Sequence, residues 1–382
     1  MAAPNRLAQL EGYLRQDPDN LALLGDVIDL LIESGQWPEA QRRAEHALRL
    51  APADQPTAYK LAVIKHYAGD AQAALQILLD LVRVGVNAAP VRCELAKVQA
   101  TLGDTPGCVA TLTALRSEAL PADLSAEVNF MLVRALHRLG KLDEAISVAE
   151  QFLQLEPDSQ TIQSALATLY LDAQRLGDAA RLFERADKNG ALDAEMLAVG
   201  GFINLDASEI GAAKAHFEQS LKQSPQGGRS WLGLGLSHAA EGELQAAKQA
   251  LAKATQAMPT HLGSWHALAW MHLLDQDLDA AQAAFDQALK VDRNFGDTHG
   301  GLAILAAMRG HRADAEEHIR TAMKLDRSSM NAAVAATLLQ HGGTMNSREF
   351  LQDAMRMLHK HALSKDEGMR ASFERLLAKA RQ

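Results

Sequence analysis

The chain has 382 residues, enough for two or three globular domains, or for one domain of any length if it is built from repeats that contact only their neighbours. Its formal net charge of −9 and 4% aromatic content disfavour a nucleic-acid partner, which needs a basic face. Two cysteines form neither a metal motif nor a disulfide framework, and no apolar stretch is long enough to cross a membrane. We therefore expect a cytoplasmic protein without membrane insertion, unless it is a piece of a longer chain.

The first predicted element is a helix within residues 1–20. The segment "NRLAQLEGYLRQDPDN" places Leu10, Tyr13 and Leu14 at helical spacing, and Pro18 follows where a helix would end. We expect residues 1–20 to form an N-terminal capping helix for the units that follow.

From residue 21 to residue 363 one pattern recurs with a step of 34 residues. Each unit predicts a helix, a short turn and a second helix, and one junction carries three extra residues near 122–125. The ten units begin at Leu21, Gln55, Ala89, Ala126, Gln160, Ala194, Gly228, Leu262, Gly296 and Met330. Glycine, which accepts the left-handed conformation that ends a helix, closes the first helix in six units: Gly35, Gly69, Gly103, Gly140, Gly242 and Gly310.

The chain ends in two atypical segments. The tenth unit is degenerate, because Glu349 stands where other units have alanine and "HGGTMN" makes a longer turn. The residues "SKDE" then predict a helix start at Ser364, so we expect a C-terminal capping helix over residues 364–382.

The order of large and small residues resembles the tetratricopeptide repeat family. Two segments carry it best: Trp231, Leu234, Gly235, Ala247, Ala254 and Pro259, and Trp265, Leu268, Ala269, Ala281, Phe285 and Ala288. The resemblance implies an all-α fold, an α-α superhelix with first helices on the concave side. It also implies that both tryptophans are core residues. Cys108 occupies a position held by alanine in eight other units, so we expect a small buried residue.

In the family, the second, fifth, ninth and twelfth residues of a unit line the concave side, with the sixth and thirteenth nearby. The early units place charges there, including the candidate partner-binding residues Lys60, Lys97, Arg134 and Arg138. The later units place apolar residues there, which predicts an apolar trough with room above Gly233, Gly300 and Gly301. The trough residues are Phe202, Leu205, Leu232, Leu236, Trp270, Leu273, Ile304, Met308 and Leu338. The alternative is that these residues are partly buried within the superhelix.

These patterns favour a non-catalytic adaptor or chaperone that binds a protein or peptide segment, such as an amphipathic helix, in the concave channel. The alternative is a scaffold that self-associates through the same channel or its terminal helices. No phosphate-binding or nucleophile motif occurs, so we expect no catalytic residue and no cofactor. The histidines are not spaced as metal ligands: His266 and His272 are six residues apart, and His299, His311 and His318 fall at different unit positions.

Overall fold

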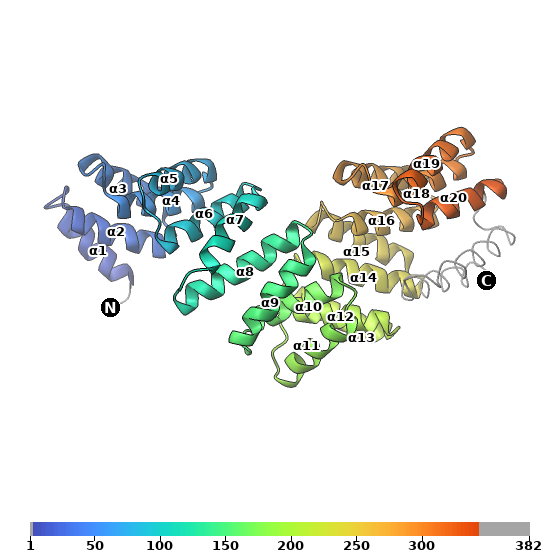
Figure 1. The fold of residues 1–382 in the computed structure, drawn as a ribbon, viewed down its shortest axis with the longest axis horizontal. Helices are drawn as coiled ribbons and strands as arrows, with labels where there is room; N and C mark the ends of the chain where they lie inside the picture. Colours follow the sequence, from blue (N-terminus) through green and yellow to red (C-terminus); the bar gives the residue numbers. More distant parts are fainter. Residues whose placement is uncertain (1–2, 344–382) are drawn as a thin grey trace. The chain divides into compact units, whose positions relative to one another are not determined.

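The computed structural model describes residues 3–343, and Figure 1 shows that this part of the chain is built from α-helices, with no β-strand among the described residues. It divides into two compact units, residues 1–174 and residues 175–382. The boundary falls inside the repeat that begins at Gln160, between its two helices, a division that the 34-residue pattern does not indicate. The predicted C-terminal capping helix and the second half of the tenth repeat lie outside the described residues.

The first unit contains α1 and four complete helix pairs followed by a single helix. Each first helix packs on its second helix and on the first helix of the next pair. The helices are α1 (Ala3–Leu14), α2 (Leu21–Glu33), α3 (Trp37–Leu50), α4 (Gln55–Tyr67), α5 (Ala71–Arg83), α6 (Ala89–Thr101), α7 (Thr105–Arg116), α8 (Ala122–Arg138), α9 (Leu142–Leu155) and α10 (Gln160–Asp172). The extra residues 122–125 are helical and lengthen α8 at its N-terminus.

The second unit repeats the same pairing after an unpaired second helix. Its helices are α11 (Leu176–Lys188), α12 (Ala194–Asp206), α13 (Ile210–Gln223), α14 (Gly228–Glu241), α15 (Leu244–Ala257), α16 (Leu262–Leu274), α17 (Leu278–Val291), α18 (Gly296–Met308), α19 (Arg312–Leu325) and α20 (Met330–Gln340). The predicted all-α class with repeated helix pairs is confirmed. None of the described helices is long and apolar enough to cross a membrane.

Glycines on the first helices let an aromatic ring of a second helix approach the backbone. A Cβ atom on Gly201 or Gly233 would lie 2.5 or 2.1 Å from the ring of Phe217, and one on Gly301 would lie 2.3 Å from the ring of Phe285. Both rings are fully buried. The expectation that Gly233 and Gly301 leave open room is therefore wrong, because the neighbouring ring fills the space that the missing side chain leaves.

The fourth residue of a unit binds the turn that precedes the unit. The indole N–H of Trp231 donates to the carbonyl of Pro225 at 2.9 Å, and that of Trp265 donates to the carbonyl of Pro259 at 2.8 Å. Both indoles are half-buried rather than core residues, since their N–H groups must reach this carbonyl near the surface. The bond joins successive repeats.

Candidate functional site

Two surfaces were predicted on the first helices, and the charged one lies in the first unit. Lys60 on α4 does not offer a free charge there. Its ammonium lies 2.7 Å from the carboxylate of Asp29 on α2 and also donates to the carbonyl of Gly25 at 3.3 Å. Lys60 therefore joins the first helices of two adjacent repeats.

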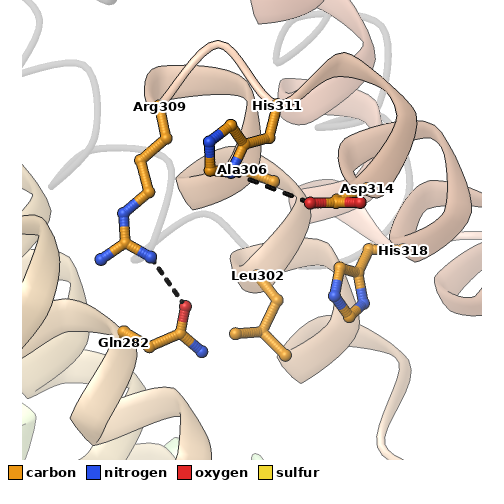
Figure 2. A pocket seen from close by; sticks show the side chains of 7 residues that line it. All are labelled: Gln282, Leu302, Ala306, Arg309, His311, Asp314 and His318. Carbon is orange, nitrogen blue, oxygen red and sulfur yellow. Dashed lines mark hydrogen bonds and ion pairs between the residues drawn. The ribbon is translucent and has the colours of Figure 1, made fainter.

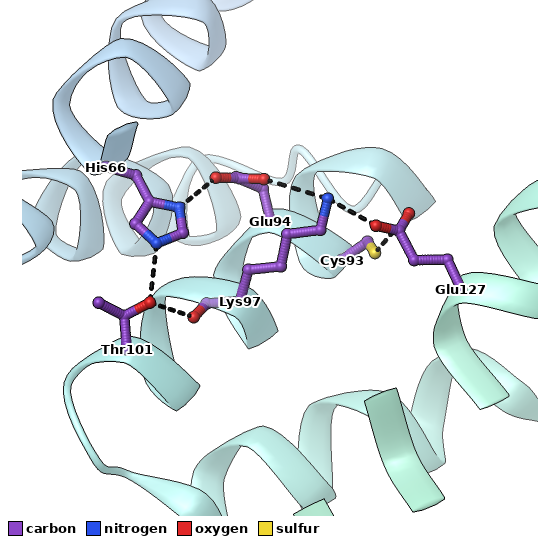
Figure 3. Close-up of polar contacts among 6 residues, drawn as sticks. All are labelled: His66, Cys93, Glu94, Lys97, Thr101 and Glu127. Carbon is purple, nitrogen blue, oxygen red and sulfur yellow. Dashed lines mark hydrogen bonds and ion pairs between the residues drawn. The ribbon is translucent and has the colours of Figure 1, made fainter. Parts of the chain in front are cut away.

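Lys97 belongs to a polar cluster that joins α4, α6 and α8 (Figure 3). Its ammonium lies 2.7 Å from Glu127 and 3.7 Å from Glu94, whose side chain is almost fully buried. His66 donates through Nδ1 to Glu94 at 2.7 Å, and its Nε2 lies 2.9 Å from the hydroxyl of Thr101. Burial by itself would lower the pKa of Lys97, but the hydrogen bond to Glu127 and the two carboxylate charges raise it above its usual value. The charge of Lys97 is therefore neutralised by Glu94 and Glu127 within the cluster.

Arg134 and Arg138 differ from the two lysines. Both are exposed, they lie one turn apart on α8, and neither forms an ion pair with another residue between 3 and 343. Arg134 lies over the ring of Phe130, 5.6 Å from its centroid. Of the predicted charged residues, these two are available to an acidic ligand.

The apolar residues predicted for the trough separate into two groups in the second unit. Four of them are half-buried on two neighbouring first helices, Phe202 and Leu205 on α12, and Leu232 and Leu236 on α14. We call these four residues the apolar strip. Phe202 packs edge-on against the buried ring of Phe217, at 5.1 Å between centroids, so the strip rests on a rigid core.

Trp270 and Met308 continue this surface only in part. Trp270 on α16 and Met308 on α18 are half-buried and pack against the core of the last repeats. The site residues that remain at least partly accessible are therefore Phe202, Leu205, Leu232, Leu236, Trp270 and Met308.

The expected exposure of Leu273, Ile304 and Leu338 is wrong, because all three are fully buried. Leu273 on α16 is enclosed in the buried core of the last repeats, and for Ile304 and Leu338 the cause is the close approach of α18 and α20. A Cβ atom on Gly300 would lie 2.5 Å from Cβ of Asn331 and 2.7 Å from the backbone nitrogen of Ala332, so the two helices can approach this closely only because residue 300 has no side chain. The first helices here cover one another, and the predicted trough does not extend to them.

Among residues 3–343, one group of three or more metal-type ligands occurs, namely His238, Glu241 and Glu243 at the turn between α14 and α15. The ammonium of Lys214 lies 2.7 Å from Glu241 and 3.3 Å from Glu243. A cation therefore already neutralises these carboxylates, and the hydrogen bonds from His238 and Lys214 lower the pKa of Glu243. These residues and Lys214 form an ion-pair network at the surface.

Both cysteines are buried and reduced. Burial raises the pKa of the Cys93 thiol to about 12, and burial also raises that of Cys108. A thiol that stays protonated at neutral pH is a poor nucleophile, so neither residue has the features of a reactive cysteine. The small buried role expected of Cys108 is confirmed.

Comparisons with known proteins agree with this repeat structure. Tetratricopeptide repeat families match residues 136–199, 204–261, 262–295 and 297–321. No curated protein sequence matches the chain. Similar solved structures include a human IFIT1 dimer with m7Gppp-AAAA and one with PPP-AAAA, each with a TM-score of 0.57. They share 14% and 15% sequence identity with this chain, and the alignments cover 98% of this chain and 94% or 95% of theirs. At such identities the likeness concerns the fold.

Proposed function

Because the chain is a tetratricopeptide repeat protein, we propose that it is a non-catalytic binding protein whose first helices hold a peptide segment of another protein. The observation that supports this function is the apolar strip: four large apolar side chains on successive first helices keep part of their surface accessible. The four residues come from α12 and α14, which pack on one another, and an accessible apolar patch on a folded protein usually marks a partner site.

We propose an amphipathic helix or an extended segment with apolar anchors as the ligand. Burying one large apolar anchor contributes roughly 1.5–3 kcal/mol before ordering costs. Three or four such anchors contribute roughly 4.5–12 kcal/mol before these costs, a range that includes the approximately 8.2 kcal/mol of micromolar binding. On the first unit, Arg134 and Arg138 would accept carboxylates of an acidic partner. An adaptor or chaperone role in the cytoplasm would fit this binding activity.

A nucleic-acid ligand is the competing proposal, since the IFIT1 structures contain short oligonucleotides. It is less well supported here. The chain carries a net charge of −9, whereas phosphate binding depends on clustered cations.

The test is to select peptides from a random library on the wild-type protein and to measure their affinity for variants. Leu236→Glu places a charge in the strip and is expected to weaken binding at least tenfold. Met323→Glu is the matched control, because Met323 is an exposed apolar residue on α19, away from the first helices, and binding should not change. Circular dichroism would verify that both variants are folded.

Three outcomes would contradict the proposal. Equal loss of binding in both variants would remove the strip as the site. Failure of the wild-type protein to select any peptide, together with salt-dependent binding of a single-stranded oligonucleotide, would favour a nucleic-acid ligand. A molar mass that rises with concentration in light scattering, and falls to the monomer in Leu236→Glu, would show that the strip serves self-association.

A further inference from the structure

The repeat that begins at Gly296 departs from its neighbours at two positions that face each other. The two preceding units have tryptophan at the fourth position and alanine at the twenty-third. In the unit immediately before, these residues are Trp265 and Ala284. This unit has His299 and His318 instead. A large and a small side chain have thus been replaced by two imidazoles, one on α18 and one on α19.

The two rings are close and one of them is held in place. Nδ1 of His299 lies 3.5 Å from Nδ1 of His318. Nε2 of His299 donates to the carbonyl of Arg293 at 3.0 Å, which is the bond that Trp265 makes to Pro259 in the preceding unit. Since Nε2 of His299 carries the hydrogen, its Nδ1 presents a lone pair toward His318.

The spacing of the two nitrogens suits a shared metal ion. Zinc binds imidazole nitrogen at about 2.0–2.1 Å in tetrahedral geometry, which places two nitrogen ligands roughly 3.3–3.4 Å apart. Histidine ligands usually donate their second ring N–H to a carbonyl or carboxylate, as His299 does.

The surroundings give access and favour a positive charge. His318 borders a pocket of about 150 Å³ that opens to solvent, together with Asp314 and His311 (Figure 2). The carboxylates of Glu317 and Asp314 each act to raise the pKa of His318, so their negative charge reaches this ring. The cationic group of the pocket, Arg309, is already neutralised by its ion pair with Asp279 at 2.6 Å.

We propose that His299 and His318 form a binding site for one divalent transition-metal ion of the zinc type, with water in its remaining coordination positions. The site joins α18 to α19 and does not depend on the peptide-binding function. In sequence the two residues are nineteen positions apart. They can be identified as a pair only by comparing this unit with the preceding units, because both positions differ there.

The experiment is titration of the wild-type protein with zinc chloride by isothermal calorimetry, alongside two variants. His299→Trp and His318→Ala restore the residues of the preceding unit, so both should fold. Each is expected to weaken zinc binding at least tenfold. His311→Ala is the control, because His311 borders the same pocket but is not one of the pair, and it should retain wild-type affinity.

A second measurement covers the case in which a variant fails to fold. In the wild-type protein, zinc should shift the ring ¹⁵N resonances of His299 and His318 together and raise the melting temperature. Zinc affinity that is equal in wild type, His299→Trp and His318→Ala would overturn the proposal. So would unchanged ¹⁵N resonances of both rings, which would mean that the two imidazoles share only a hydrogen bond.

Discussion

Phe217 illustrates how one side chain sets the distance between helices at the residue scale. Its ring comes from α13 and reaches the backbone of α12 at Gly201 and of α14 at Gly233. Because the interior is close-packed, a ring in this position leaves no volume for a methyl group on either glycine. Gly301, at the same unit position as Gly233, is paired with Phe285 in the same way, whereas the glycine of the tetratricopeptide pattern, Gly235, faces Leu251 instead.

We therefore expect Gly233→Ala to lower the free energy of unfolding by about 1–3 kcal/mol, because its methyl group would clash with Phe217. Gly211→Ala is the control. Gly211 lies on α13 with nothing within 4 Å of the added Cβ, so this change should stabilise the helix by up to about 1 kcal/mol. Urea unfolding followed by circular dichroism measures both. Stabilisation of both variants to the same extent would contradict the packing role of Phe217.

At the scale of the helix, the residue that ends each first helix shows how strongly the repeat constrains the backbone. Nine equivalent positions, one repeat apart, all have positive φ between 57° and 93°. Six are the glycines expected from the sequence and three are not glycine, namely Gln174, Ser208 and Gln276. A side chain in this conformation costs roughly 1–2 kcal/mol, so these three turns are held by the packing of the helices around them.

Gln276→Gly is accordingly expected to raise the free energy of unfolding by about 1 kcal/mol, because glycine adopts φ 60° without a Cβ penalty. The reverse change at the equivalent position of the next unit, Gly310→Gln, should destabilise by a similar amount. Thermal unfolding of both variants checks the pair. The changes in the free energy of unfolding of the two variants must have opposite signs. A loss of stability in Gln276→Gly would show that the Gln276 side chain has another role.

At the scale of the whole molecule, buried histidines make the stability of the second unit depend on pH. Four histidines of the second unit have pKa values lowered by burial: His216, His266, His272 and His318. His266 is the most enclosed; it lies 2.8 Å from the hydroxyl of Thr298 and packs edge-on against Phe285. The unfolded state binds protons on these rings near pH 6.5, whereas the folded state resists them to lower pH.

The stability of the second unit should therefore be fully present above about pH 6.5 and fall as the pH decreases toward 5, since the unfolded chain then takes up more protons. Urea unfolding at several pH values measures this. Fluorescence is suited to it because three of the four tryptophans, Trp231, Trp265 and Trp270, lie in the second unit. In His266→Gln the decrease between pH 7 and pH 5 should be smaller. A decrease of the same size would assign the effect to other groups.

The periodic sequence predicts the helices well and the accessibility of their faces only in part. Glycine and N-capping residues act locally, as when Asp54 accepts from the backbone N–H of Thr57, so most helix ends follow from the chain alone, whereas the turns at Gln174, Ser208 and Gln276 depend on packing. Exposure depends on how far apart successive first helices lie. That distance is set by Gly300 for α18 and α20, which is why Ile304 and Leu338 are buried although Leu232 and Leu236 are half-buried.

Lys60 and Lys97 show the same limit for charge. Their positions on the first helices could be assigned by counting residues, but their partners Asp29 and Glu127 are about one repeat away, and only the packed helices bring the groups to 2.7 Å. The sequence by itself determined the all-α repeat, most of its helix ends and its small core positions, because these depend on local conformational preference and periodicity. The tertiary structure decided which apolar residues stay accessible, which charges are neutralised and that His299 meets His318, because each of these depends on distances between helices that no local pattern encodes.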